Sequence, residues 1–129
     1  MTDKAGLLLF AHGARDPNWA RPFHAVADRV RALRPDAEVR LAFLELMSPD
    51  LATAGAELAA AGCRTITVVP LFLGAGGHVR KDLPALTAAL EAAHPGLHVT
   101  LATAVGEHPL VIGALAEAAT APPSPTAAP

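Results

Sequence analysis

The segment Val69–Pro84 reads V-P-L-F-L-G-A-G-G-H-V-R-K-D-L-P and combines three features of a ligand site. It continues an apolar, β-branched run that begins at Arg64 and is typical of a strand buried on both faces. The run ends in Gly74–Gly77, where little side chain remains, so a ligand could approach the main chain closely. His78 follows at the start of a helical pattern. Together these features predict a site for a large ligand.

The composition indicates one folded domain and argues against nucleic-acid binding. The 129 residues are 52% hydrophobic and 17% charged, which is enough for a real core. A net charge of −2 argues against a general phosphate-backbone binder, and 4% aromatic residues with no Tyr argue against base stacking. The lone Cys63 excludes an internal disulfide and a Cys-only zinc site, and we expect it to be a small buried hydrophobe.

The two ends of the chain are expected to lie outside the core. Met1–Gly6 is short and polar, and Leu7–Ala11 is too brief for a signal or membrane segment, so we expect a cytoplasmic protein. The last nine residues, 121–129, read A-P-P-S-P-T-A-A-P and contain four prolines. We therefore expect a single domain over residues 1–120 and a disordered Pro/Ala-rich tail over 121–129.

Apolar runs and helical patterns alternate four times along the chain. The predicted strands are Leu7–Ala11, 39–46, Thr65–Leu73 and Leu97–Ala102. The first predicted helix begins at Asp16-Pro17, and the second runs from Ser48-Pro49-Asp50 to Gly62. The third contains Leu86 and Leu90 and ends at Pro95-Gly96. The fourth spans Pro109–Ala119, with Leu110, Ile112 and Leu115 as its apolar residues. Because strands alternate with helices, the sequence predicts an α/β fold with a four-stranded parallel sheet and helices on both faces.

Polar residues follow each of these strands. His12 comes after the first strand, Glu45 closes the second, His78 follows the third, and Gly106-Glu107-His108 follows the fourth. Ligands of open α/β sheets bind at the carboxyl ends of the strands, so we expect these residues to share one end of the sheet.

Two imidazoles and a carboxylate can hold a divalent metal. Neutral histidine suits Co²⁺, Ni²⁺, Fe²⁺ and Zn²⁺, and a carboxylate can complete part of the shell. His12, Glu45 and His78 would leave coordination positions open, as catalytic and delivery sites do. Imidazole also accepts protons near neutral pH. The sequence thus predicts a loosely held metal beside a group that removes protons from an incoming chelator.

The same residue types also suit purely structural roles or different ligands. His12 could cap backbone groups, and Glu45 could pair with a neighbouring arginine. The glycine loop lacks the Lys and Ser/Thr of a P-loop, and no G-x-G-x-x-G follows the first strand. A flavin would normally be flanked by aromatic residues, and only Trp19 lies near the predicted site.

Four segments resemble the small sirohydrochlorin chelatases of the CbiX/SirB group, which are ATP-independent class II chelatases. The segment quoted first resembles the family signature, and H-G-A-R at His12–Arg15 is similar to the family's H-G-S-R, with Ala14 in place of Ser. F-L-E-L-M-S-P-D-L at Phe43–Leu51 and G-E-H-P at Gly106–Pro109 match two further segments. The matches come in the family's order and extend from Leu7 to about residue 118.

The resemblance implies a flavodoxin-like, doubly wound chelatase domain that pairs as a homodimer with its substrate in a cleft. The implied reaction is insertion of Co²⁺ or Fe²⁺, or of Ni²⁺ in one branch, into sirohydrochlorin on the way to cobalamin or sirohaem. The metal would be a substrate, with no permanently bound cofactor and no ATP. A carrier of metal or tetrapyrrole without turnover, and a flavodoxin-like signalling or FMN domain, are the alternatives.

The resemblance also implies roles for individual residues. His12 and His78 match the metal-binding and proton-accepting histidines, and Glu45 matches an acidic position that joins them on the metal. Positive charge at Arg15, Arg80 and Lys81 would suit the carboxylates of sirohydrochlorin. The positions expected to contact the substrate are Arg15, Ser48, Leu73, Gly74, Ala75, Gly76, Gly77 and Arg80.

Overall fold

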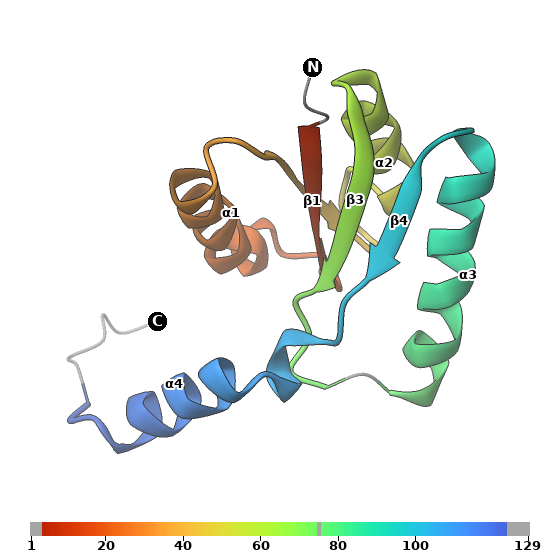
Figure 1. The fold of residues 1–129 in the computed structure, drawn as a ribbon. Coiled ribbons are helices and arrows are strands. Elements are labelled where there is room, and N and C mark those ends of the chain that lie inside the picture. Colours follow the sequence, from red (N-terminus) through yellow and green to blue (C-terminus); the bar gives the residue numbers. More distant parts are fainter. Residues whose placement is uncertain (1–3, 75, 124–129) are drawn as a thin grey trace.

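The computed structural model describes residues 4–74 and 76–123, except for the side chain of His78. Its centre is a four-stranded parallel sheet with the strand order β2-β1-β3-β4 (Figure 1). The strands are β1 (Lys4–Ala11), β2 (Glu38–Phe43), β3 (Cys63–Pro70) and β4 (His98–Leu101). The predicted fold class is confirmed, although β2 and β3 each end three residues earlier than expected, at Phe43 and Pro70.

Helices connect the strands and follow the last one. They are η1 (Pro17–Ala20), α1 (Arg21–Leu33), α2 (Leu51–Ala60), α3 (Gly77–Ala93), η2 (Val105–Glu107) and α4 (Pro109–Thr120). The predicted helix signals are confirmed at both ends of α2. The Asp50 carboxylate accepts the Thr53 N–H at 2.8 Å, and Gly62 ends the helix with a φ of +100°.

One face of the sheet is fully covered. α2 and α3 lie side by side on it and bury the side chains of Leu8, Phe10, Ile66 and Val68 to 1% exposure or less. Leu58 of α2 is completely buried in the same cluster. The burial of these large side chains is the main source of the fold's stability.

The other face is covered over only part of its width. α1 packs on β1 and β2 there, around Leu9, Leu41 and Phe43. Residues of β3 and β4 alternate between the two faces, so Thr65 and Thr67 point to the same side as α1. Thr65 is exposed and Thr67 half-buried, because no helix of the described chain covers them.

The last helix leaves the apolar side chains of its sequence pattern exposed. Figure 1 shows α4 projecting away from the sheet, beyond the short η2. Leu110, Ile112 and Leu115 are 78%, 55% and 48% exposed. The helix predicted over Pro109–Ala119 is confirmed as Pro109–Thr120, while the apolar side chains that define its pattern lie exposed. Helical spacing indicates that a helix has an apolar side, and it does not say against what that side packs.

Two other expectations concern membrane segments and the end of the chain. Within the described residues no helix has the length and apolar character needed to cross a bilayer. The predicted tail begins at residue 121, and its residues 124–129 lie outside those described.

Candidate functional site

The four strands run in the same direction, so they all end at one end of the sheet, here called the carboxyl end. Ala11, Phe43, Pro70 and Leu101 are the last residues of the strands there. The loops that follow carry the residues predicted from the sequence, and α2 and α3 begin at the same end.

His12 and Glu45 come together at the carboxyl end. The Nε2 atom of His12 lies 3.2 Å from Oε1 of Glu45, although 33 positions separate the two residues. Their side chains are 49% and 55% exposed, so both remain accessible to a metal or a ligand. Among the described side chains, the carboxylate of Glu45 thus pairs with His12 and not with a neighbouring arginine. An imidazole nitrogen and a carboxylate oxygen at this separation can bind the same divalent ion.

Main-chain hydrogen bonds hold this pair in place. The Leu44 N–H donates to the Ala11 carbonyl at 2.9 Å, and the Glu45 N–H donates to the His12 carbonyl at 3.1 Å. Gly13 has a φ of +99°, and a Cβ atom there would overlap the Glu45 carbonyl. Only glycine fits this position, because both the conformation and the close approach exclude a side chain.

Phe72 connects the loop after β3 with His12. Its ring is 7% exposed and meets the His12 imidazole edge-on, with 6.0 Å between the ring centres. The Phe72 carbonyl accepts the Gly106 N–H at 2.9 Å, which joins this loop to the one after β4. Three of the four loops at the carboxyl end therefore converge around His12, through Glu45 and Phe72.

The predicted third ligand is only partly placed. His78 lies in the first turn of α3, at the carboxyl end, but its side chain is outside the described part of the structure. Among the side chains that are described, no three of His, Cys, Asp or Glu gather closely enough to hold a metal. The pairing of His78 with His12 and Glu45 stays a prediction.

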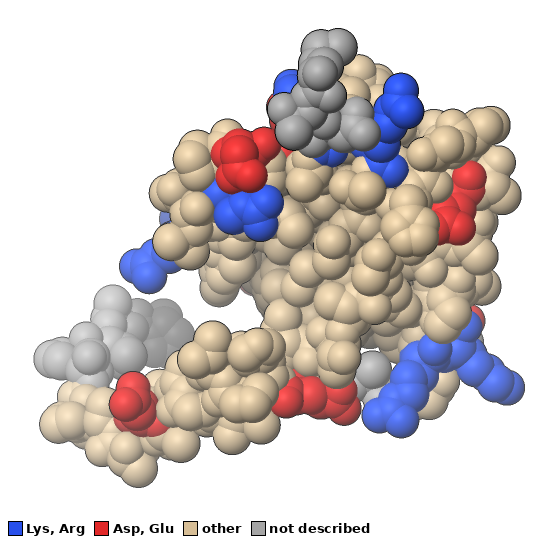
Figure 2. Space-filling model, viewed as in Figure 1, with Lys and Arg blue, Asp and Glu red and all other residues tan. Residues whose placement is uncertain are grey.

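Most of the positions expected to contact the substrate are accessible. Ala75 lies outside the described residues; the others, all exposed or half-buried, are Arg15, Ser48, Leu73, Gly74, Gly76, Gly77 and Arg80. Figure 2 shows Lys and Arg side chains gathered over the first turns of α3, the part that contains Arg80 and Lys81. The guanidinium of Arg80 faces Glu107, with Nη2 and Oε1 3.8 Å apart. Such a long, exposed pair leaves the guanidinium available to another carboxylate.

Two hollows open beside this basic group. One of about 150 Å³ is lined by Arg80, Leu83 and the start of the loop after β4. A second, of about 350 Å³, shares Ala102–Ala104 and Glu107 with it and extends to Pro109. They give a substrate's acidic side chain space close to Arg80.

Three residues at this end have roles that the sequence pattern does not predict. Phe72 fits the apolar run of the predicted strand, which hides that its ring packs beneath the loop and against His12. Glu107 follows the fourth strand, but its pairing with Arg80 depends on the fold. Leu46 has a φ of +64°. Nothing in its local sequence predicts that conformation.

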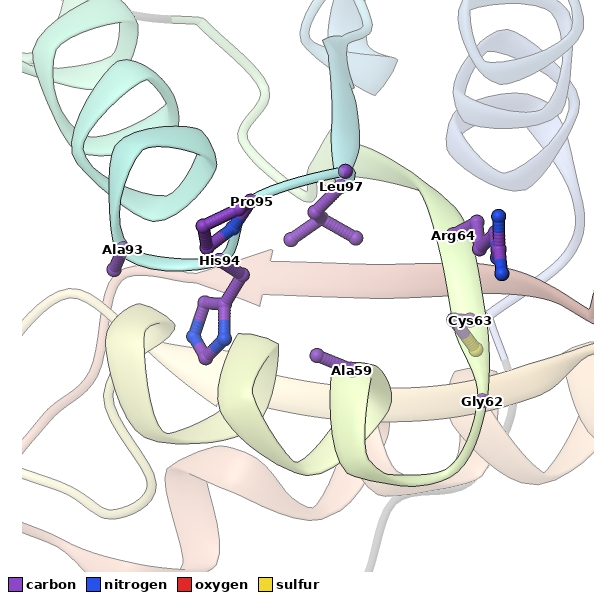
Figure 3. A pocket seen from close by; sticks show the side chains of 9 residues that line it. Ala59, Gly62, Cys63, Arg64, Ala93, His94, Pro95 and Leu97 are labelled. Atoms are coloured by element: carbon purple, nitrogen blue, oxygen red, sulfur yellow. The ribbon is translucent and has the colours of Figure 1, made fainter.

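A larger hollow lies at the opposite, amino end of the sheet. It measures about 470 Å³ and is bounded by the ends of α2 and α3 and the starts of β3 and β4. Figure 3 shows His94 and Cys63 well apart on its walls, so they do not converge on one point. Burial raises the pKa of the Cys63 thiol, which keeps it protonated and unreactive. This hollow lacks the converging groups of a chemical site.

Comparison with known proteins identifies the family of the chain. The sequence model of the CbiX family matches residues 6–121. The sirohydrochlorin cobaltochelatase of Methanosarcina acetivorans is 36% identical over 86 residues, which cover 67% of this chain and 66% of that protein. The chain therefore spans slightly less than two thirds of the length of this curated relative.

Solved structures show the same fold. A CbiX protein from Marinobacter aquaeolei VT8 is 36% identical, with a TM-score of 0.78 over 89% of this chain and 93% of that one. The sirohydrochlorin chelatase SirB from Bacillus subtilis subspecies spizizenii, solved in complex with cobalt, is 24% identical with a TM-score of 0.72. That alignment covers 79% of this chain and 44% of SirB, and it establishes a shared fold alone.

Proposed function

The chain belongs to the CbiX family, and from this premise we propose that it is a sirohydrochlorin chelatase. The reaction would insert a divalent metal, Co²⁺, Fe²⁺ or Ni²⁺, into the tetrapyrrole without ATP. The observation that carries the proposal is the exposed His12–Glu45 pair, 3.2 Å apart at the carboxyl end of the sheet. We extend the proposal to a cytoplasmic location, which fractionation of expressing cells tests.

The proposed mechanism uses the metal as a substrate that the protein holds loosely. His12 and Glu45, with His78, bind the ion through an incomplete set of ligands, so that coordination positions stay open. The tetrapyrrole lies over Gly74–Gly77, where Gly74, Gly76 and Gly77 leave the main chain open to a close approach. Its nitrogens replace the protein ligands one by one. The inner N–H protons pass to His12 or His78, so the ring loses protons as the metal enters.

Charge at the carboxyl end supports the substrate class. Sirohydrochlorin is flat and carries carboxylates around its rim. Arg15 and Arg80 are exposed at this end, and Arg80 lines a hollow that could take an acidic side chain. Arginine binds carboxylates through paired N–H donors, so these residues would orient the ring. Ser48 and Leu73, also accessible, would complete the contacts.

The decisive experiment mixes the protein with sirohydrochlorin and Co²⁺ under anaerobic conditions and follows the absorbance change. We expect insertion well above the spontaneous rate, and loss of that excess in a variant carrying both His12→Ala and His78→Ala. Circular dichroism should show that this variant is folded. His94→Ala, at the amino end, is the matched control and should insert normally. Full activity in the double variant would refute the proposed roles.

The same assay separates the alternatives. Tight binding of sirohydrochlorin or cobalt with no acceleration over the spontaneous rate would indicate a carrier. Binding of FMN in preference to metal would indicate a flavodoxin-like domain. Repeating the assay with Fe²⁺ and Ni²⁺ would establish which metal the protein prefers, because ligand type alone permits several.

We also propose that the chain works as a homodimer. Two observations support a partner. The leucines and the isoleucine of α4 are exposed. α1 also leaves part of the sheet uncovered, whereas parallel sheets are normally buried on both faces. Figure 2 shows α4 separated by a gap from the body of the domain. Pairing two copies would also let a cleft enclose a ring that one small domain leaves open.

Light scattering after size exclusion tests the dimer. We expect twice the chain mass for the wild type and a monomer for Leu110→Asp combined with Ile112→Asp. Leu33→Asp, an equally exposed leucine at the end of α1, is the control and should leave the mass unchanged. A monomeric wild type at the concentrations of the assay would refute this part of the proposal.

A further inference from the structure

Leu46 adopts a backbone conformation that is unfavourable for leucine. Its φ is +64°, the one positive value for a non-glycine residue among those described. The Met47 N–H donates to the Glu45 carbonyl at 2.8 Å, which closes a three-residue turn around Leu46. Turns of this kind with a positive φ at the centre are rare and strained, and leucine has no polar side-chain atom to compensate.

The turn is fixed by its surroundings and is not a loose loop. The preceding residue, Glu45, is tied to His12 through both its main chain and its carboxylate. Gly13 lies directly against the Glu45 carbonyl that accepts the hydrogen bond of the turn. After the turn, the Pro49 carbonyl accepts the Phe43 N–H at 2.9 Å. The conformation of Leu46 is therefore imposed by the same contacts that hold the candidate metal ligands.

Burial does not compensate for the strain. The Leu46 residue is 57% exposed, so its isobutyl group contributes little to the core. Glycine or asparagine would adopt the same backbone conformation more easily and would expose no apolar surface. Backbone strain that surrounding contacts impose is concentrated at functional sites of proteins.

The strand order places an exposed leucine on each side of His12. β1, which leads to His12, lies between β2 and β3 in the sheet. The loop after β2 carries Leu46, and the loop after β3 carries Leu73, which is 70% exposed. The expected metal-binding pair is thus flanked by apolar surface from both neighbouring loops.

We propose that Leu46 is a substrate-contacting residue that packs on a face of the tetrapyrrole while the ring lies over His12 and Glu45. This inference rests on the proposed function. A macrocycle of this kind is apolar on its faces and charged at its rim, so aliphatic side chains suit the faces and arginines suit the rim. The contact is made equally before and during insertion, and its loss should therefore raise KM more than it lowers kcat.

The test compares three substitutions of Leu46. Leu46→Gly and Leu46→Asn relieve the strain, so each should unfold at the same or a higher urea concentration than the wild type. Both also remove the apolar contact, so KM for sirohydrochlorin should rise about tenfold or more. Leu46→Met keeps apolar surface and should keep KM within about threefold. Leu33→Ala, an exposed leucine on α1, is the control and should change neither quantity.

The binding of Co²⁺ alone should be the same in all four variants, because Leu46 supplies no metal ligand. Unchanged KM in Leu46→Gly and Leu46→Asn would overturn the inference and leave Leu46 a structural residue. A raised KM that accompanies conversion of a dimer to a monomer would also overturn it, in favour of contact with a second copy.

Failure of the proposed function gives a different result. A wild-type protein that binds sirohydrochlorin without inserting metal would refute the chelatase proposal, and the dissociation constants of the variants would then replace KM in the test of Leu46. A wild-type protein that neither binds nor metallates the ring would refute both.

Discussion

At the amino end of the sheet, a hollow of about 470 Å³ is lined by His94, Cys63 and the ends of α2 and α3. At the carboxyl end, smaller hollows open beside Arg80 and Glu107. On the neighbouring loops of that end, His12 and Glu45 meet at 3.2 Å and are joined by main-chain hydrogen bonds. The largest of these hollows lacks convergent groups, whereas His12 and Glu45 converge without lining any of the three. In this fold, the convergence of polar side chains on one point marks the candidate site better than the volume of a hollow does.

The largest expected difference between the two ends concerns their glycines. Gly13→Ala should lower the free energy of unfolding by about 3 kcal/mol for two reasons. Alanine is strained at this positive φ, and its Cβ atom would overlap the Glu45 carbonyl. Gly62→Ala, at the amino end, has a similar φ of +100° with open space around it and should lose only about 1 kcal/mol. Urea denaturation measures both. Equal losses would show that the loops at the carboxyl end are not tightly joined.

Metal binding should distinguish the two ends next. Co²⁺ at about 100 times its Kd should stabilise the folded wild type by about 2.7 kcal/mol, seen as a higher Tm. His12→Ala should abolish most of this gain, because His12 belongs to the expected binding pair. His94→Ala should retain it. The comparison fails if both substitutions reduce the cobalt-dependent shift to the same extent.

The smallest predicted effect concerns α2, which begins at the carboxyl end and finishes at the amino end. Asp50→Ala should lower the free energy of unfolding by about 1 kcal/mol at pH 7, because the N-cap bond to Thr53 is lost. Hydrogen bonds from Thr53 hold the pKa of Asp50 below its ordinary value of 3.8. The carboxylate's stabilisation is therefore fully present above pH 3.8 and disappears as the pH falls through the lowered pKa of the folded state.

Urea titrations at pH 7 and near pH 3 check this pH dependence. Asp50→Asn is the matched control, since asparagine caps helices well without titrating. The free energy of unfolding of the wild type, minus that of Asp50→Asn, should fall as the pH is lowered from 7 to about 3. A constant difference would mean that the charge of Asp50 contributes nothing.

Much of the site could be predicted because it depends on a rule of topology. Parallel strands end together, so residues that follow them meet, and His12 and Glu45 illustrate this. The end of β3 could not be predicted from its apolar run. β1 pairs with β3 only as far as Phe10, which lies opposite Pro70, and Phe72 turns into the core where a longer strand was expected. Apolar residues fit a strand and a buried loop equally well.

Two further features depend on contacts that no local pattern contains. The positive φ of Leu46 is imposed by hydrogen bonds from segments distant in sequence, so its own side chain gives no signal. The exposure of α4 has a similar cause. Leu110, Ile112 and Leu115 show that the helix has apolar residues, while their surroundings depend on where the chain leads after β4.

The way the loop after β2 is anchored has a consequence for the evolution and redesign of this protein. Leu44 and Glu45 are attached to the end of β1 by their peptide groups, and those bonds are indifferent to which side chain occupies position 45. In the proposed site, the side chain at position 45 can therefore be exchanged while the position of its main chain is preserved. If position 45 binds the metal as proposed, selection or an engineer could alter the metal preference by replacing one side chain on an unchanged backbone.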